Sequence, residues 1–546
     1  MAEVDIRKFP HKSYRQLYES FRWNIPNYFN IGEATCDRHS EDRSRVAIFY
    51  EDDQGNKSKH TFWDLKNQSN QLANFLKDLG IKRNDIVGVL LPSRPETTIA
   101  LLALYKLGCV ALSMSPLFGS DAVEYRLKNS KAKGLILESE RKDIRKIAGE
   151  IKTLKHVIVV EGERLGEKEL SFEEAETASA HFELAKTASE DPAQMFYTSG
   201  TTGSPKGTLH AQRFLLGHIP AFQLYFDLAP KENDVFWTPA DWGWIGALGD
   251  VLLPALYFGM PVLAFRRSGG FNAHTALAIM EKYQVTCAFI PPTALRMIRK
   301  TVKHPAREYD LSLRVIASAG ERVGVDNVIW GQEELGIPIN EFYGATEANL
   351  VVATCSKIME ARPGAMGKPC PGHTVEVLDE KGNILPPGHV GEIAVKAPDP
   401  VIFLGYWNMP EAATKKKFKG EWFLMGDLGF KDEEGYLWFK SRADEIIKSA
   451  GYRIGPEEVE NVINQHPAVL ESAVVPKPDP IRGHIVKAFI VLRDGFEPSK
   501  ELEAEIQRKV KKKLAAYAYP REIEFIKEIP KTVTGKVKRY ELKEKA

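Results

Sequence analysis

Short apolar segments alternate with longer segments of helical periodicity through the middle of the chain. Between about residues 85 and 345, apolar runs are separated by segments in which apolar positions recur every three or four residues. The predicted strands are DIVGVLL, CVALSM, GLILES, PVLAF, TCAFI, LRVIASA and PINEFYG, and the predicted helices lie near 95–107, 121–130, 273–283 and 293–301. Strands that alternate with helices form parallel sheets covered by helices, so this region is predicted to be α/β.

Two apolar stretches, 97–117 and 245–265, are long enough to suggest membrane spans. The first contains Lys106 and the second contains Asp250 and two prolines. These residues divide each stretch into a helix-sized piece followed by a strand-sized piece. We therefore expect buried helix-to-strand units and no membrane insertion.

The pattern changes after residue 365. TVEVLDEKGNILPPGHVGEIAVK and GFKDEEGYLWF have the alternation and turn residues of hairpins. A helix in GPEEVENVINQ, strands in ESAVVPKP, IVKAFIVL and REIEFIK, and a helix through 500–514 then indicate a separate α+β unit. We predict a large N-terminal domain, 1–443, of helix-covered sheets with a β-rich subdomain, and a small mobile α+β domain, 444–546.

Composition limits the class of protein. The 546 residues exceed what one hydrophobic core usually supports. Lys and Arg total 74 against 73 Asp and Glu, with no long block of one sign, so no nucleic-acid partner is expected. The five cysteines lack metal-ligand spacing, and the first residues lack an apolar targeting segment, so a cytoplasmic protein is predicted.

The segment YTSGTTGSPKGT, residues 197–208, is rich in Gly, Ser and Thr and contains one lysine. Glycines expose backbone N–H groups, and hydroxyl groups and Lys206 add further partners for a phosphate. It is not a Walker A loop, because position 205 is proline and Lys206 is followed by Gly207. A flexible linker is the alternative, but a linker does not usually follow a buried strand, which favours phosphate binding.

A second cluster, NEFYGATEANL at 340–350, places Tyr343, Thr346 and Glu347 just past an apolar strand. Ligands of α/β sheets gather at the carboxyl ends of strands. Tyr343 could stack on a base, Thr346 could contact a phosphate, and Glu347 could hold Mg²⁺. Taken alone, the segment is more simply interpreted as a hydrophilic helix start.

Two further clusters lie nearer the C-terminus, and each alone is a weak signal. Asp427 and Arg442 belong to GDLGFKDEEGYLWFKSRADEIIK and could contact a sugar or a phosphate. Lys536 lies on a Thr-Gly turn in PKTVTGKVKR.

Together, in this order and at these separations, the four clusters resemble the motifs of the adenylate-forming superfamily. This superfamily includes acyl-CoA synthetases, firefly luciferase and peptide-synthetase adenylation domains. The resemblance covers nearly the whole chain, and segments such as NYFNIGEA and ADWGW are most similar to medium-chain acyl-CoA synthetases and their benzoate-CoA ligase relatives.

The resemblance implies a role for individual residues. The β and γ phosphates of ATP would lie on Thr198, Ser199, Gly200, Thr201, Thr202, Gly203 and Lys206. The adenine would lie against Gly320, Glu321, Arg322 and Tyr343, and the ribose against Asp427 and Arg442. The catalytic residues would be Lys536, Thr346 at the α-phosphate, and Glu347 as the Mg²⁺ ligand. Arg453 would contact a phosphate, Asp444 would be the hinge, and Gly451 and Tyr452 would line the CoA channel.

The family's reaction has two steps. A carboxylate first attacks the α-phosphate of ATP, and pyrophosphate leaves. The small domain, which carries Lys536, then rotates about the hinge, and the CoA thiol takes the acyl group. The resemblance therefore implies an AMP-forming acyl-CoA synthetase, an acid-thiol ligase that uses ATP, Mg²⁺ and CoA and whose first step is reversible.

The acyl pocket differs from that of acetyl-CoA synthetases. Their pocket tryptophan corresponds to Gly344 here, and Ala345 replaces the following glutamine. Ile245 and Gly246 replace a valine and a threonine, and Ala319 replaces another valine. Loss of the tryptophan side chain opens space for a ring or several methylenes, each of which contributes roughly 0.8 kcal/mol to binding when it is buried. We therefore expect an acid larger than acetate: medium-chain, branched, alicyclic or aromatic.

Some alternatives stay open. A fatty acyl-AMP ligase or a luciferase-like oxygenase would share the ATP motifs but use a different acceptor. Trp242 and Trp244 either line a channel or pack in the core. His210 is likewise either a pocket wall or a packing residue.

Overall fold

The computed structural model describes residues 4–164, 166–198, 205–443, 445, 447–449, 452–479, 483–514, 518–532 and 535–546, without the side chains of residues 448, 452, 453 and 483. The chain forms two compact units. Unit 1 contains the residues up to Thr198, Pro205–Val375 and Val395–Phe423. Unit 2 contains Glu376–Ala394 and the residues from Leu424 onward.

One sheet of unit 1 has eight strands in the order β19-β9-β8-β4-β3-β5-β6-β7. Its parallel strands are β3 (Ile86–Leu90), β4 (Val110–Ser113), β5 (Gly134–Glu138), β6 (His156–Val160), β7 (Glu169–Ser171) and β8 (Pro192–Thr198). Two antiparallel strands, β9 (Lys206–Ala211) and β19 (Gly405–Tyr406), complete one edge.

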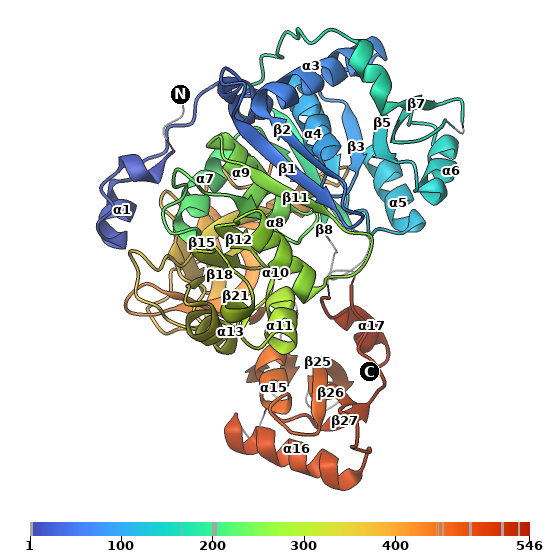
Figure 1. Ribbon diagram of the computed structural model, residues 1–546. Coiled ribbons are helices and arrows are strands. Elements are labelled where there is room, and N and C mark those ends of the chain that lie inside the picture. The colour runs from blue at the N-terminus through green and yellow to red at the C-terminus, as the bar shows by residue number, and fades with distance from the viewer. Residues whose placement is uncertain are drawn as a thin grey trace. The chain divides into compact units, whose positions relative to one another are not determined.

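Helices cover both faces of this sheet, as Figure 1 shows for its labelled elements. Along β3, Val87 and Val89 join one hydrophobic cluster, whereas Ile86 and Leu90 join another. The first cluster includes α3 (Phe62–Asp78) and α4 (Pro95–Leu107), and the second includes α5 (Ser120–Ser130) and α6 (Lys142–Glu150). Successive side chains of a strand point to opposite faces. Because helices cover both faces, side chains on both are apolar, and each strand is a continuous apolar run in the sequence.

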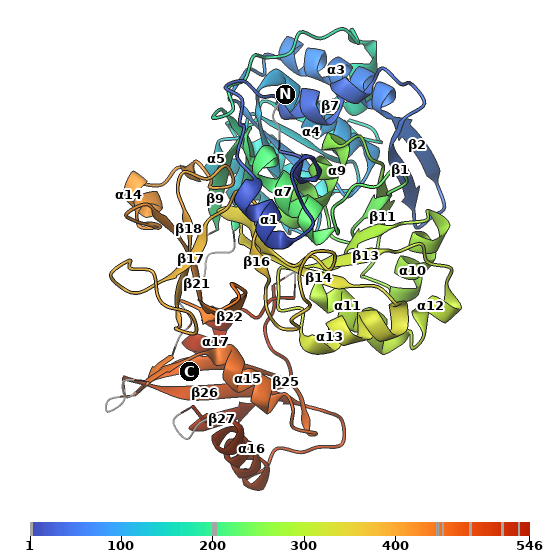
Figure 2. The same ribbon diagram turned by 90° about the vertical axis from the view of Figure 1, so that its left-hand side faces the viewer.

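The other sheet of unit 1 has nine strands in the order β16-β15-β14-β13-β12-β10-β11-β1-β2. Its parallel strands are β1 (Val46–Asp52), β10 (Phe236–Trp237), β11 (Val262–Arg266), β12 (Cys287–Phe289), β13 (Val315–Ser318) and β14 (Ile339–Ala345). The antiparallel strands are β2 (Lys57–Thr61), β15 (Ala348–Ala353) and β16 (Lys368–Pro369). One face packs on α10 (Ala273–Lys282), α11 (Pro292–Thr301) and α13 (Val325–Trp330), which lie together in Figure 2. These parallel, helix-covered sheets confirm the predicted α/β class.

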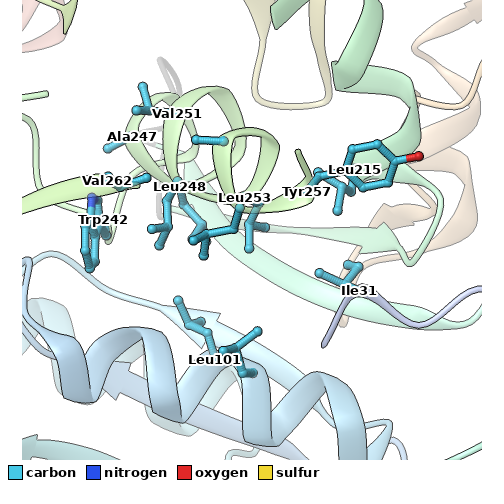
Figure 3. Close-up of a cluster of buried hydrophobic side chains, with 14 of the residues drawn as sticks. Ile31, Leu101, Leu215, Trp242, Ala247, Leu248, Val251, Leu253, Tyr257 and Val262 are labelled. Atoms are coloured by element: carbon cyan, nitrogen blue, oxygen red, sulfur yellow. The ribbon is translucent and has the colours of Figure 1, made fainter. Parts of the chain in front are cut away.

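Both apolar stretches that imitate membrane spans are helix-to-strand units, as predicted. Residues 97–117 contribute to α4 and β4, and residues 245–265 form α8 (Ile245–Ala247), the π-helix η4 (Leu248–Leu252), α9 (Leu253–Tyr257) and most of β11. Figure 3 shows Leu248 and Leu253 pointing toward Leu101 of α4 in a shared hydrophobic cluster. Within the described ranges, the helices are too short or too polar to cross a membrane.

The predicted hairpins form a five-stranded sheet whose residues are divided between the two units. Its order is β17-β18-β21-β20, and β22 pairs with β21. The strands are β17 (Val375–Leu378), β18 (Gly391–Lys396), β20 (Phe418–Lys419), β21 (Trp422–Lys431) and β22 (Leu437–Arg442).

The C-terminal part of unit 2 is α+β, as predicted. Its sheet has the order β24-β23-β26-β25, with β27 beside β26. The strands are β23 (Ile447–Ser449), β24 (Tyr452–Ile454), β25 (Val469–Asp479), β26 (Gly483–Leu492) and β27 (Glu522–Phe525), and the helices are α15 (Pro456–Ile463), α16 (Lys500–Lys513) and α17 (Arg539–Glu544). The domain boundary near residue 444 stays a prediction.

Shorter elements complete the described chain. They are η1 (Ile6–Lys8), α1 (Tyr14–Ser20), α2 (Ile31–Thr35), η2 (Asp37–His39), η3 (Phe172–Thr177), α7 (Phe214–Tyr225), α12 (Pro305–Glu308), η5 (Gly331–Leu335) and α14 (Glu411–Lys415).

Candidate active site

The Gly/Ser/Thr segment joins two antiparallel strands. Thr198 ends β8, Lys206 begins β9, and the two residues are paired in register. Their strands form a hairpin, whereas a Walker A loop leads from a strand into a helix. The intervening residues predicted to hold phosphates, Ser199, Gly200, Thr201, Thr202 and Gly203, lie outside the described residues.

Thr346 and Glu347 form the turn between the antiparallel strands β14 and β15. The helix start that this segment suggests in isolation is therefore wrong. A register shift between Tyr343 and Ala345 distorts the hairpin, and residues 343–347 are all partly exposed. Thr346 and Glu347 thus lie on an accessible turn at the carboxyl end of β14, and Tyr343 lies near the end of that strand.

Tyr406 connects Glu347 with the start of β9. Its hydroxyl group donates a hydrogen bond of 2.7 Å to Oε1 of Glu347. The Nζ atom of Lys206 lies 5.4 Å from the centroid of the Tyr406 ring. Pairing of β19 with β9 brings these residues together from distant parts of unit 1. Sequence reasoning missed Tyr406, because the segment FLGYWN reveals its strand partner only in the folded chain.

The segment predicted to line the adenine follows β13. Gly320 has φ +88°, a left-handed conformation that favours glycine. Both carboxylate oxygens of Glu321 accept hydrogen bonds of 3.0 Å from the Thr293 hydroxyl, and Arg296 donates another of 2.7 Å. The exposed Arg322 is close enough to the buried Glu341 for electrostatic attraction.

Asp427 and Arg442, the predicted ribose contacts, are adjacent in unit 2. They lie opposite each other on β21 and β22, and Nη1 of Arg442 is 2.9 Å from Oδ1 of Asp427. The carboxylate is buried, whereas the Arg442 side chain is 37% exposed. The arginine therefore holds the buried carboxylate, and part of its own side chain reaches the surface.

Lys536 belongs to unit 2 and is exposed on a tight turn. The Thr532 N–H donates to the Lys536 carbonyl oxygen at 2.7 Å, and Gly535 adopts φ +86°. Of the other predicted residues in this unit, Asp444, Gly451 and the side chains of Tyr452 and Arg453 lie outside the described residues.

The residues predicted to form the acyl pocket all lie in unit 1. Ile245 and Gly246 are partly exposed at the start of α8, and Ala319 is buried after β13. A Cβ atom on Gly246 would lie 3.3 Å from Cε1 of Phe289. A Cβ atom on Gly344 would lie 2.4 Å from the backbone nitrogen of Leu350. The close approach of the hairpin backbone thus requires glycine at 344. The absence of a side chain there is therefore not in itself evidence for a larger acyl pocket.

The structure places the three ambiguous aromatic residues. Trp242 is buried in the core shown in Figure 3. Trp244 is partly exposed and packs edge-on against Phe118, with ring centroids 5.4 Å apart.

His210 lies in a buried position between aromatic rings, those of Phe196 and Phe214. Burial lowers the pKa of His210 to about 3, although a hydrogen bond with the Thr346 backbone opposes this shift. His210 is therefore a neutral, buried side chain that packs beside the Thr346 turn.

Comparison with known proteins identifies the family. Residues 33–407 match the family described as AMP-binding enzyme, and residues 458–536 match its C-terminal domain. An acetyl-coenzyme A synthetase of Bacillus subtilis is 35% identical, with 97% of this chain and 95% of that protein covered. A mitochondrial acyl-coenzyme A synthetase of Rattus norvegicus is 36% identical over 95% of this chain and 91% of its own length.

The same fold occurs in a solved anthranilate CoA ligase in complex with anthranoyl-AMP. It is 30% identical, has a TM-score of 0.83, and covers 95% of this chain and 98% of its own. The chain therefore belongs to the AMP-binding enzyme family, the adenylate-forming superfamily. Within that family it is an AMP-forming acid–CoA ligase, the class that uses ATP, a carboxylic acid and CoA.

Proposed function

We propose that this ligase activates a carboxylic acid larger than acetate, of medium-chain, branched, alicyclic or aromatic type, and transfers its acyl group to CoA. A carboxylate oxygen attacks the α-phosphorus of ATP, the bond to the bridging oxygen breaks, and pyrophosphate leaves. The CoA sulfur then attacks the acyl carbon, and AMP leaves. Adenylation is necessary because direct substitution at a carboxylate would have to expel oxide.

The arrangement of Lys206, Tyr406 and Glu347 supports the first step. Lys206 lies beside the Tyr406 ring, and the same tyrosine fixes one oxygen of Glu347. The ammonium group and the N–H groups of the preceding segment would hold the departing phosphates, with Thr346 at the α-phosphate. Asp427 and Arg442 would hold the ribose. Positively charged groups fixed in a water-poor site stabilise the charge that develops during transfer of the adenylyl group.

Glu347 fits the role of a Mg²⁺ ligand. Its Oε1 atom accepts from Tyr406, and the residue is partly exposed. Among the described residues, no group of three or more His, Cys, Asp or Glu side chains could hold a metal ion. Mg²⁺ in nucleotide enzymes is commonly bound by one or two carboxylates together with substrate phosphates, so a single carboxylate is sufficient here. A bound Mg²⁺ would neutralise charge on the phosphates.

The preference for a larger acid rests on Gly246. This residue is partly exposed at the start of α8, and the ring edge of Phe289 lies 3.3 Å from the position its Cβ atom would occupy. An acyl chain or ring there would contact an aromatic wall. Each additional buried methylene would contribute roughly 0.8 kcal/mol to binding.

A panel of carboxylic acids tests the proposal. Linear acids from acetate to decanoate, branched and alicyclic acids, and benzoates are compared by pyrophosphate and AMP release with and without CoA. We expect kcat/KM at least about 10-fold higher for a larger acid than for acetate, and AMP turnover that requires CoA. Rapid AMP release without CoA would instead indicate an acyl-AMP ligase or another acceptor.

Gly246→Val would narrow the proposed acyl pocket beside Phe289. The variant should shift the preferred acid to a shorter one by two or more methylenes. Gly269→Ala is the matched control, because a Cβ atom there meets nothing within 4 Å. An unchanged preference in Gly246→Val would contradict this location for the acyl group.

A further inference from the structure

Asp250 is a buried carboxyl group in the π-helical segment η4, only 2% exposed. Its backbone carbonyl oxygen accepts a 2.5 Å hydrogen bond from the Tyr225 hydroxyl. Tyr225 is itself stacked on Phe342 of β14, with ring centroids 4.3 Å apart. The position of Asp250 is therefore fixed from both the helix and the sheet.

One carboxyl oxygen of Asp250 is occupied within the protein. Nδ2 of Asn349 donates to Oδ1 at 2.5 Å, and Asn349 is itself buried on β15. In the part of the chain that the structure describes, no group forms a hydrogen bond with the second oxygen, Oδ2. A carboxyl oxygen without a hydrogen bond beside a binding site offers a partner to a polar group of a ligand.

Oδ2 faces the proposed acyl pocket. A Cβ atom on Gly246 would lie 3.6 Å from Oδ2 of Asp250 and 3.3 Å from Cε1 of Phe289. Gly246 and Asp250 are four residues apart, so they share one face of the helical segment. The missing side chain at 246 leaves the carboxyl oxygen and the aromatic edge next to the same partly exposed position.

We infer that Asp250 is a specificity-determining residue that binds a hydroxyl group on the tail of the acid, which makes a hydroxylated carboxylic acid the preferred substrate class. This inference rests on the proposed acyl pocket. A hydroxyl group both donates and accepts, so it suits Oδ2 whether or not the carboxyl group is ionised. Burial raises the pKa of Asp250 well above its ordinary value, partly opposed by the Asn349 hydrogen bond, which favours the protonated form of the carboxyl group.

The test compares hydroxylated acids with their deoxy parents. Linear acids with a terminal hydroxyl group and benzoates with a hydroxyl group at each ring position are assayed by pyrophosphate release in the presence of CoA. For the wild-type protein we expect at least one hydroxylated acid to exceed its parent in kcat/KM by about 10-fold or more. In Asp250→Leu this ratio should fall to about 1, because the partner of the hydroxyl group is lost.

Asp250→Asn is the matched control. An amide keeps an acceptor for Asn349 and presents a donor at the position of Oδ2, so most of the hydroxyl preference should remain. Gly246→Ala is a second variant for the case that Asp250→Leu does not fold. Its methyl group would stand beside Oδ2 and should lower the hydroxyl ratio while Asp250 stays in place.

The outcomes separate this inference from the proposed function. Activity on unsubstituted acids, with no hydroxylated acid preferred, would overturn the inference and leave the proposed function standing. A hydroxyl preference that persists unchanged in both Asp250→Leu and Gly246→Ala would assign Asp250 a purely structural role. Failure to adenylate any acid would contradict the proposed function itself.

Discussion

Glu341 is a buried carboxyl group on β14, next to the segment that we propose for the adenine. Burial raises its pKa from 4.5 to about 8, and attraction to Arg322 partly opposes the shift. Between these two values the folded chain keeps a proton that the unfolded chain has released. The unfolding free energy should therefore fall as pH rises through this range, by up to about 1.4 kcal/mol per pH unit.

Glu341→Gln should remove this contribution, because an amide does not titrate. Below about pH 4.5 the wild-type protein has the full contribution of Glu341 to the unfolding free energy. This contribution is lost as pH rises toward about 8. The variant should show a flatter dependence of unfolding free energy on pH, measured by urea unfolding at about pH 5, 6, 7 and 8. Exposed Glu232→Gln is the control, and equal slopes in the wild type and Glu341→Gln would contradict the assignment.

At the residue scale, local strand pairing places two residues of one predicted site side by side, while their contact with a ribose stays a prediction. Asp427 and Arg442 were predicted to share a ligand, and they form an ion pair across two adjacent strands. Gly344 was interpreted as space for a substrate, but the hairpin backbone itself requires glycine there. Tyr406 forms a hydrogen bond with Glu347, and Asp250 forms one with Asn349. Because these partners are far apart in the sequence, no local pattern indicates either pair.

Among the elements, α3 shows how local chemistry fixes a helix boundary. Thr61 precedes the helix, and its hydroxyl oxygen accepts from the Asp64 N–H at 3.1 Å. The Asp64 carboxylate accepts in return from the Thr61 N–H at 2.9 Å. This capping box satisfies two backbone donors where the helix offers no partner. It orients Phe62 and Leu65 toward the core.

Thr61→Ala should destabilise unit 1 by about 1 kcal/mol, the usual contribution of an N-cap side chain. Urea unfolding should show a lower midpoint with an unchanged slope. Ser58→Ala, on the exposed part of β2, should leave the unfolding free energy within about 0.5 kcal/mol of the wild-type value. A similar midpoint for both variants would argue against a stabilising cap.

The strands and helices that were predicted between residues 85 and 345 could be recognised because each is determined by local periodicity and turn residues. The helix at 95–107 and the strand that follows it are examples. The segment after β14 could not be interpreted in this way, because its Thr, Glu and Asn residues suit both a helix start and a tight turn. Only the pairing of β15 with β14 and β16 resolves this ambiguity.

At the scale of the whole molecule, the residues that we propose for the reaction belong to two different units. Lys206, Thr346 and Glu347 belong to unit 1, whereas Asp427, Arg442 and Lys536 belong to unit 2. The proposed hinge at Asp444 would let the predicted mobile domain, 444–546, present Lys536 in the first half-reaction and withdraw it in the second. These residues lie in separate segments of the sequence and share no local motif. Only the resemblance to a family therefore predicts that they act in one reaction.

Lys536→Ala should lower adenylate formation by about 100-fold or more while sparing thioester formation from a supplied acyl-adenylate. Asp444→Pro should have the reverse effect, because a restricted hinge would impair the second step. Pyrophosphate release reports the first half-reaction, and loss of free CoA thiol reports the second. Exposed Lys512→Ala is the control, and equal loss of both half-reactions in Lys536→Ala would refute the assigned role.

The outer strands of the two large sheets limit how this protein can associate. The edge strand β2 reads KSKHT, with Lys57, Ser58 and Lys59 exposed. The opposite edge strand, β16, has two residues, one of them a proline without an N–H group. The edges of the eight-stranded sheet are similarly short, at β7 and β19. A second molecule that extended either sheet would meet lysine charges or too few backbone partners, which protects the folded enzyme against edge-to-edge aggregation.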